Sequence, residues 1–512
     1  MTQTIATVAL VVFALSMMTI GIFSMRKAQT MEGFLLGGRK MGPWISAFAY
    51  GTSYFSAVVF IGYAGMHGWK IGIGSIWIGI GNAIVGCYLA WRLLARRTRT
   101  MTHKIKASTM PEFLERRFNS SPMKVYAAII IFVFLVPYAA SVYKGLGVLF
   151  SAIFPGSSEI VCMAIVAALT AVYLVLGGYV ATAVNDFIQG IIMLAGVVLM
   201  IAAIISRPEV GGFVGMFEKL AAVEPSEVLP GGGSQLVNIW GGSSFKFLLT
   251  NILLTSIGVW GLPQMVHKYY TISDESQINK ATVISTLFAI VIGVGAYLVG
   301  STGHLFIPAA ADGMPSVGYD NVMPTILMKA LTGNVWLNIL LSVIMLLLLS
   351  ASMSTLASIV LTSSSAISVD IIKVIKPDIS EKKQMLIMRL LCLLFVALSF
   401  VFATLNISFI VNLMSFSWGV VAGSFIGPYI WGLYSKKVTK AGAWAGTLSG
   451  LVVVGAVLAV ITAMSGFDAA KALAPEMGVA AMAVSVIVVP IVSAFTKKLD
   501  EKFVESCFVK EK

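Results

Sequence analysis

Residues 348–366 read LLSASMSTLASIVLTSSSA, and the run that leads into them and overlaps their first three residues, 334–350, reads NVWLNILLSVIMLLLLS. Together they form one apolar segment that exceeds the ~20 residues needed to cross a bilayer as a helix. The segment nevertheless carries hydroxyl groups where lipid would favour leucine, at Ser350, Ser352, Ser354, Thr355, Ser358 and Thr362. The segment therefore predicts a membrane helix whose hydroxyl groups need a partner, either within the protein or in a bound ion.

One face of this helix bears most of the oxygen atoms. Helical spacing places on that face Ala351, Ser354, Thr355, Ser358 and Thr362. Two interpretations are open at this point. The hydroxyls can bond to carbonyls one turn back and let helices pack closely. Alternatively, they can coordinate a hard cation such as Na⁺, which prefers oxygen ligands.

The composition agrees with a membrane protein. Of 512 residues, 58% are hydrophobic and only 11% are charged, and the mean hydropathy is +0.93. Soluble domains carry about 25% charged residues. Helices are the spanning element that runs of this length favour, because a membrane β-barrel would alternate polar and apolar residues. We expect an all-α polytopic protein embedded in a lipid bilayer.

The apolar runs predict thirteen spans. They cover residues 5–24, 42–68, 71–92, 123–153, 157–176, 180–205, 243–267, 281–303, 334–366, 386–404, 407–434, 442–463 and 476–495. With the N-terminus outside and the C-terminus in the cytoplasm, the internal segments hold 28 of the 35 Lys and Arg residues. The positive-inside rule supports this orientation. Topology thus accounts for the net charge of +13, and no nucleic-acid partner is expected.

Several function classes lose support. Four scattered cysteines show no CxxC spacing and no His cluster nearby, so neither a disulfide framework nor a Cys/His metal centre is expected. No Walker sequence is present, which weighs against ATP as the energy source. The first apolar segment lacks a basic n-region and a cleavage site, which favours a retained helix. We expect no enzyme; a secondary transporter or a channel of the cell membrane remains.

Asp186 stands apart from the other acidic residues, which fall in loops or near span edges. It lies in GGYVATAVNDFIQGIIMLAGVVL, residues 177–199, within a predicted span that contains no Lys or Arg. An intramembrane carboxylate costs about 2.5–3.5 kcal/mol on insertion scales and usually faces a cavity, a partner or an ion. The alternative is a protonated or water-solvated Asp near the cytoplasmic end of its helix.

Two spans carry helix-breaking residues. Residues 46–68, SAFAYGTSYFSAVVFIGYAGMHG, contain Gly51, Gly62 and Gly65. Five helices later, residues 251–270 read NILLTSIGVWGLPQMVHKYY, in which Pro263 removes a backbone donor and frees a carbonyl. Paired interruptions at corresponding positions are typical of transporters with inverted repeats, whose freed carbonyls bind the coupling ion. A kink without function is the alternative for either helix.

These segments resemble those of the solute:sodium symporter family. The resemblance rests on residues 34–65, on GGYVATAVNDFIQG (177–190), on SMSTLAS with SSSAIS (352–358 and 363–368), and on NLMSFSWGVVAGSFIGPYIWGLY (412–434). The STL triplet and WRLLARRTR (91–99) are similar to the sodium/proline symporter branch. The resemblance implies a ten-helix core of two inverted repeats, with broken first and sixth core helices, and Na⁺ as the coupling ion.

The resemblance also implies site residues. A first sodium ion would be held by backbone carbonyls at Thr52, Phe55 and Ala351 and by the hydroxyls of Ser354 and Thr355. Some members hold a second ion with positions that match Asp186, Ser354 and Ser358; here Ala357 stands where those members have Ser, which leaves the second ion open. The solute pocket is expected between the broken halves, at Ser56, Trp260, Gln264, Ser417 and Trp418.

We therefore expect a sodium-coupled symporter of a small organic solute, either an amino acid such as proline or a small carboxylate. Tyr54, Ala57-Val58, Val259 and Leu262 depart from the proline branch, so the solute stays open. A proton-coupled permease using Asp186 and a transporter-like membrane sensor are the alternatives, and a leak channel comes third. The predicted organisation is an extra helix and loop (1–41), a first repeat with an external loop (42–242), a second repeat (243–434) and two C-terminal helices with a short tail (435–512).

Overall fold

The computed structural model describes residues 2–25 and 29–508. Within these ranges the backbone forms helices and loops, and pairing between extended segments is limited to two isolated bridges. The long helices are α1 (Thr2–Ser24), α8 (Ser121–Ile153), α9 (Glu159–Ile205), α14 (Ile278–Gly300), α17 (Val335–Ile367), α19 (Glu381–Thr404), α20 (Ile410–Tyr434), α21 (Lys440–Ser465) and α23 (Ala474–Phe495). The all-α prediction is confirmed.

The remaining spanning segments are built from shorter pieces. They are α3 (Pro43–Tyr54), η3 (Val58–Tyr63), α4 (Ala64–Ile71), α5 (Ile76–Gly81), η5 (Asn82–Leu89), η6 (Trp91–Ala95), α6 (Arg96–Lys104), α12 (Phe245–Gly258) and α13 (Pro263–Thr271). Short helices in the connections are α2 (Met31–Leu36), α7 (Met110–Phe118), α10 (Gly212–Ala221), α11 (Gly232–Leu236), α15 (Gly303–Phe306), α16 (Val322–Ala330), α18 (Lys373–Ile375), α22 (Phe467–Ala472) and α24 (Glu501–Cys507).

Eleven continuous helical stretches in the described ranges are long and apolar enough to cross a membrane. Two of them, Val58–Lys104 and Glu159–Ile205, have 47 residues each and contain a glycine outside helical geometry. Gly72 has φ 69° and Gly178 has φ 54°, which glycine adopts without a Cβ penalty. Gly178 lies between two predicted spans and Gly72 at the start of another, and the count of thirteen crossings stays a prediction.

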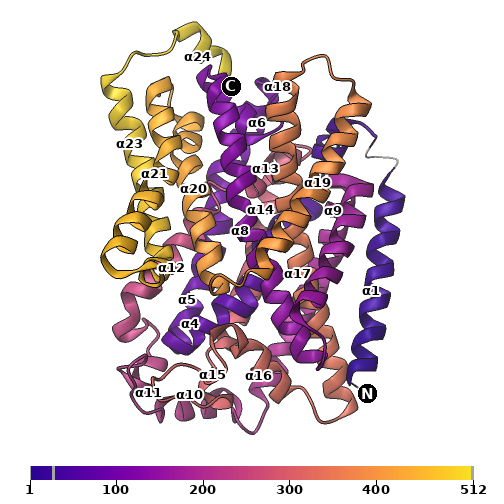
Figure 1. Cartoon of the computed structure of the whole chain (residues 1–512), viewed down its shortest axis with the longest axis vertical. Coiled ribbons are helices and arrows are strands. Elements are labelled where there is room, and N and C mark those ends of the chain that lie inside the picture. The colour runs from indigo at the N-terminus through magenta and orange to yellow at the C-terminus, as the bar shows by residue number, and fades with distance from the viewer. Residues whose placement is uncertain (1, 26–28, 509–512) are drawn as a thin grey trace.

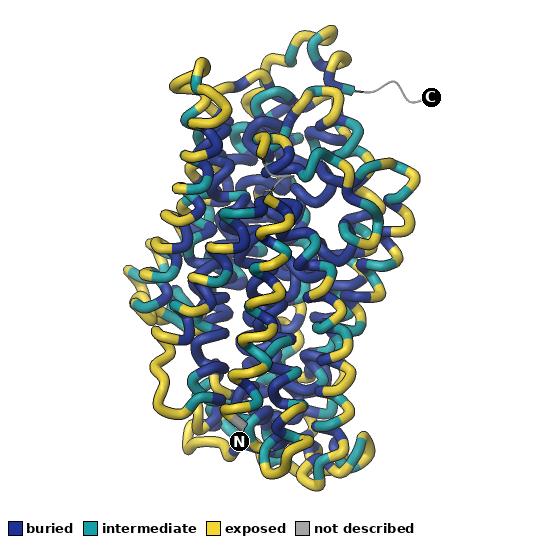
Figure 2. Tube along the Cα trace, turned by 90° about the vertical axis from the view of Figure 1, so that its right-hand side faces the viewer, coloured by how far each residue is buried: buried dark blue, intermediate teal, exposed yellow. Residues whose placement is uncertain are grey.

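The helices stand side by side, with α1 at one edge and α21 and α23 at the other (Figure 1). Helix α17 packs against α8, α9 and α1, while α20 packs against α8, α21 and α23. The start of α1 and the short helix α24 lie at opposite ends of the bundle (Figure 1). Buried residues fill the interior and exposed residues follow the outer helix faces and the loops (Figure 2), as expected for a helix bundle whose outer faces meet lipid.

Both predicted helix breaks are present. Helix α3 ends at Tyr54, and Phe55 adopts extended geometry with φ −102° and ψ 107°. Helix α12 ends at Gly258, and the chain turns until Leu262, with φ −81° and ψ 120°, precedes the start of α13 at Pro263. Proline suits this first helical position because its missing N–H has no intrahelical acceptor there. The breaks place four helix ends inside the bundle.

The second half of the sixth core helix is longer than predicted. The sequence favoured a helix end at residue 267, with Lys268 in the following internal segment. In the structure α13 continues to Thr271, and Lys268 is only 1% exposed. The prediction was wrong about Lys268. A basic residue near the end of an apolar run suggests the end of a span, and the sequence does not show that neighbouring helices bury this part of α13.

Candidate functional site

Oxygen atoms gather where α3 ends beside the middle of α17. The hydroxyl oxygen of Thr355 lies 3.0 Å from the carbonyl oxygen of Ala351, 3.3 Å from that of Thr52 and 3.1 Å from that of Ser53. A threonine hydroxyl has one proton to donate. Three carbonyl oxygens around it therefore form an electron-rich cluster, which is the environment that a hard cation prefers.

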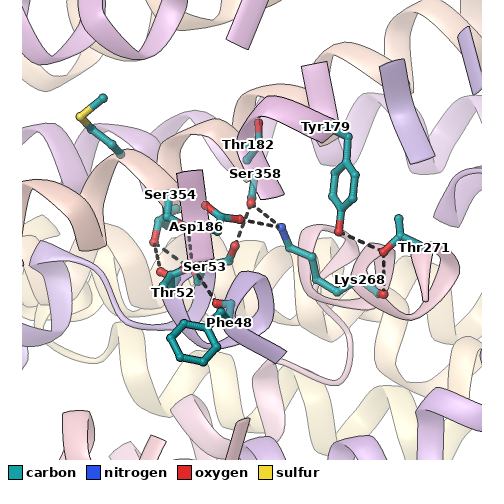
Figure 3. A network of polar contacts seen from close by, with 12 residues as sticks. Phe48, Thr52, Ser53, Tyr179, Thr182, Asp186, Lys268, Thr271, Ser354 and Ser358 are labelled. Carbon is teal, nitrogen blue, oxygen red and sulfur yellow. Dashed lines mark hydrogen bonds and ion pairs between the residues drawn. The ribbon is translucent and has the colours of Figure 1, made fainter. Parts of the chain in front are cut away.

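Ser354 joins the same cluster from the next position on α17. Its hydroxyl donates to Thr52 Oγ1 over 2.8 Å, and Thr52 Oγ1 in turn lies 2.8 Å from the carbonyl oxygen of Phe48 (Figure 3). Ser352, on the same helix, accepts from the backbone N–H of Ala57 over 3.0 Å. Helix α17 thus contacts both sides of the break that follows α3.

Four of the five residues predicted to hold sodium therefore lie together, namely Thr52, Ala351, Ser354 and Thr355. The fifth, Phe55, sits at the break itself, where extended geometry ends the helical hydrogen-bond pattern. The carbonyl oxygens of the last helical turn accept no hydrogen bond within the helix, so they are available to other partners. The arrangement can hold Na⁺ without adding formal charge, and the ligand set itself stays a prediction.

A second polar cluster adjoins the first and contains Asp186 and Lys268. The Lys268 ammonium donates to Ser358 Oγ over 2.9 Å and lies 3.7 Å from Asp186 Oδ2. Ser358 Oγ also lies 2.8 Å from Ser53 Oγ, which links the two clusters. Figure 3 shows the lysine side chain pointing into this group of oxygen atoms. Asp186 is fully buried, as Lys268 nearly is.

The aromatic ring of Tyr179 completes the surroundings of the ammonium. Lys268 Nζ lies 5.2 Å from the ring centroid, within the range of a cation–π contact. The Tyr179 hydroxyl is fixed 3.0 Å from Thr271 Oγ1, at the end of α13. Among the described residues neither carboxylate oxygen of Asp186 has a hydrogen-bond partner, so the Lys268 charge is its main compensation.

A small closed cavity lies next to the break in α3. Its walls are formed by Tyr54, Ser56, Val59, Tyr63, Asn82, Tyr138, Thr255, Met414 and Trp418. Its free volume is about 10 Å³, near the least that one water molecule requires. The wall is aromatic and polar, and none of its side chains carries a formal charge at neutral pH.

The predicted solute-binding residues have different environments. Ser56 and Trp418 line the cavity. The Trp260 indole N–H donates to the carbonyl of Val85 over 3.0 Å. The remaining two predicted residues, Ser417 and Gln264, are buried. The Ser417 hydroxyl donates to the carbonyl of Phe134, and Gln264 Oε1 has no hydrogen-bond partner among the described residues.

Sequence reasoning missed most of the cavity wall. Asn82 is the clearest case, because its Oδ1 accepts from Thr255 Oγ1 at 2.8 Å and from Ser256 Oγ at 3.0 Å. A signal for it existed, since Asn82 is the one asparagine within the predicted span 71–92. For Tyr63 and Tyr138 there was no such signal, because a buried aromatic residue in a membrane span is usually part of the packing.

Two further charged groups are buried away from the cavity. On the predicted external side, Lys144 Nζ lies 3.0 Å from Asp320 Oδ2, and Asp320 also accepts from the N–H of Ile410 over 3.3 Å. Burial raises the pKa of Asp320 above its ordinary value, and Lys144 opposes that shift. At the other end of the bundle, Asp370 is fully buried, although it lies beyond the predicted span end at residue 366. Helix α17 is extended there by η10 (Ser368–Ile372), so the predicted span ended too early.

Comparison with known proteins places this geometry in a family. A model of the sodium:solute symporter family matches residues 34–450. The chain belongs to the sodium:solute symporter family. Its relatives include the sodium/proline symporters of Staphylococcus aureus strains JH9 and JH1, each 29% identical over 501 residues, with 96% of this chain and 93% of each relative covered.

A solved structure shares the fold. A Na⁺-coupled sialic acid symporter in a substrate-bound outward-open state superposes with a TM-score of 0.77 at 18% sequence identity, covering 97% of this chain and 99% of that one. Family membership and the apolar helices together indicate that this chain is a multi-pass, sodium-coupled membrane transporter. The predicted family and coupling ion agree with these comparisons.

Proposed function

We propose that this chain imports a small organic solute together with Na⁺ by alternating access. The observation that carries the proposal is the oxygen cluster between the broken end of α3 and Thr355 on α17. Sodium would bind the carbonyls of Thr52, Phe55 and Ala351 and the hydroxyls of Ser354 and Thr355. An ion there would hold the broken helix against α17 only while it is bound.

The cavity beside the break is the proposed solute site. Ser56 is one residue beyond the sodium ligand Phe55, and it lines the cavity together with Trp418 on α20. Sodium that fixes the backbone at Phe55 would therefore also fix one wall of the cavity. This shared backbone segment couples the two binding events, because each ligand orders a structure that the other contacts.

The proposed solute is an amino acid such as proline, or a small carboxylate. Relatives named sodium/proline symporters support the first choice. The cavity itself offers aromatic rings, hydroxyls and the Asn82 amide without a formal charge. A zwitterion has no net charge to balance, so it suits such a wall better than a solute with a strong net charge. Trp260, Gln264 and Ser417 stay proposed contacts for a pocket larger than the closed cavity.

For the topology, we keep the predicted orientation in the cell membrane, with the N-terminus outside and the C-terminus in the cytoplasm. The division at residues 41, 242 and 434 is also proposed. Inward release would follow when the broken helices move relative to α8 and α17, as described for inverted-repeat transporters.

The test is uptake into proteoliposomes without ATP. A panel of amino acids and small carboxylates is offered in sodium buffer and in choline buffer, with and without a proton gradient. We expect proline or a related solute to enter only with external Na⁺, and the double variant with Ser354→Ala and Thr355→Ala to be nearly inactive. Equal uptake in choline and sodium, with a proton gradient required, would instead support a permease that uses Asp186. Binding of solute with no uptake under any gradient would support a sensor.

A further inference from the structure

The position of the Lys268 ammonium is the starting observation. It lies inside an oxygen cluster that α9, α17 and α3 form, where it donates to Ser358 Oγ and lies 3.7 Å from Asp186 Oδ2. Ser53 Oγ is hydrogen-bonded to Ser358 Oγ. Two of these oxygen-bearing residues, Asp186 and Ser358, belong to the set expected to hold a second sodium ion.

An ammonium and a sodium ion compete for such a cluster. The described part of the site offers one negative charge, the Asp186 carboxylate, which is completely buried. A second buried cation beside Lys268 would lack compensation, and unpaired buried charge is strongly unfavourable. A lysine ammonium needs hydrogen-bond acceptors around it, as sodium needs oxygen ligands, and the two can therefore use the same atoms.

The neighbouring residue on α17 points to the same conclusion. Ala357 is fully buried and contributes a methyl group, so α17 offers no hydroxyl one position before Ser358. Lys268 is in turn held in place by more than its ion pair, because its ammonium faces the Tyr179 ring at 5.2 Å. The cation in this position is thus attached to α13 and cannot exchange with solvent.

We propose that Lys268 is a built-in cation that occupies the place of a second sodium ion, so that this transporter binds one Na⁺ per cycle. The inference rests on the proposed sodium coupling and adds its stoichiometry. In this arrangement Asp186 compensates Lys268 rather than a transported ion. Ser358 is then an ammonium acceptor, whereas Ser354 and Thr355, one turn earlier on α17, serve the transported sodium.

The test counts bound sodium on the purified full-length protein by equilibrium dialysis with radioactive Na⁺ in choline buffer. We expect one Na⁺ per wild-type chain. Lys268→Met removes the ammonium and keeps most of the side-chain length, so this variant should bind two. Adding Asp186→Asn to that variant removes the remaining charge and should restore one. Lys144→Met is the matched control, because it removes another lysine, partly buried, that is paired with an aspartate, Asp320, and it should stay at one.

A second measurement does not depend on how the lysine variants fold. Ser358→Ala deletes one oxygen, and the inference predicts that the Na⁺ concentration for half-saturation changes less than about threefold, whereas Ser354→Ala raises it at least about tenfold. Two ions on the wild-type chain, one ion on a folded Lys268→Met variant, or a tenfold loss in Ser358→Ala would each overturn the inference and leave sodium coupling intact. No saturable Na⁺ binding to the wild type would overturn the proposed function, and this inference with it.

Discussion

The hydroxyl of Ser354 donates to the hydroxyl of Thr52 across 2.8 Å, although the two residues are 302 positions apart in the chain. This bond joins the middle of α17 to the last turn of α3. It has no structural reason to persist when the broken helix moves away, because both hydroxyls can bond to carbonyls of their own helices. The pair therefore reports on the contact that sodium is proposed to stabilise.

Replacing Ser354 or Thr355 by Ala should raise the sodium concentration needed for half-maximal uptake at least about tenfold, a loss of ~1.4 kcal/mol in binding. Alanine favours the helix, so the amount of protein in the membrane should not change. Ser363→Ala is the control, since Ser363 is buried on the same helix and its hydroxyl has no partner in the described structure. Wild-type sodium dependence in both site variants would place the ion elsewhere.

Gly258→Ala should weaken solute binding by reshaping the cavity. A Cβ atom at Gly258 would lie 2.9 Å from Cε3 of Trp418, closer than ordinary contact, so the ring must shift. Overpacking of this kind costs about 1–3 kcal/mol, and we expect the KM for solute to rise about tenfold. At Gly455 an added Cβ meets no atom within 4 Å, so Gly455→Ala should leave KM unchanged. Similar KM values for the two variants would contradict the assignment of Trp418 to the pocket wall.

Asp320 should make the folded protein more resistant to mild acid. Burial raises the pKa of its carboxyl in the folded protein, so between the unfolded and folded pKa values the native state binds more protons than the unfolded chain. The stability from this group is then greatest below the unfolded pKa and falls as pH rises through the folded pKa. Above about pH 4, the ordinary carboxyl pKa, and until the raised pKa of Asp320 is passed, the Tm of the wild type should fall more steeply with rising pH than the Tm of Asp320→Asn. Parallel Tm curves would show that Asp320 does not titrate in this way.

Single cysteines should report the orientation of the chain. The native cysteines are all buried, which keeps the background labelling low. Glu224→Cys lies in the predicted external segment and Lys437→Cys in a predicted internal one, and both positions are exposed. A membrane-impermeant maleimide applied to intact cells should label the first, and it should label the second only after permeabilisation. The reverse pattern would invert the proposed topology.

The broken helices and the first oxygen cluster could be predicted from the sequence because their signals are local. Pro263 lacks a backbone donor, and it does start α13. The break after α3 was located less directly, because it falls at Phe55 whereas Gly51, Gly62 and Gly65 lie within helical segments. Likewise, hydroxyls at helical spacing on α17 mark one face without any knowledge of the neighbours. These features need only the 3.6-residue period and the cost of polar groups in lipid.

The second cluster could not be predicted in the same way. Asp186 and Lys268 are 82 positions apart, and neither sequence neighbourhood shows that the two helices meet. The lysine also stands near a predicted span end, where basic residues are common for reasons of topology. The cavity wall was missed for a related reason, since Tyr63 and Tyr138 differ from ordinary packing aromatics only in what they face.

A cation attached to α13 also determines how many charges cross the membrane in each transport cycle. Lys268 moves with the protein and returns with it, so under the one-sodium proposal a single sodium ion would carry charge inward with a neutral solute. A membrane potential of 100 mV contributes about 2.3 kcal/mol to such a charge, and a tenfold sodium gradient adds about 1.4 kcal/mol. Together they limit the accumulation of solute to roughly 500-fold. A second transported sodium would square that ceiling and double the slope of the logarithm of the accumulation ratio against voltage.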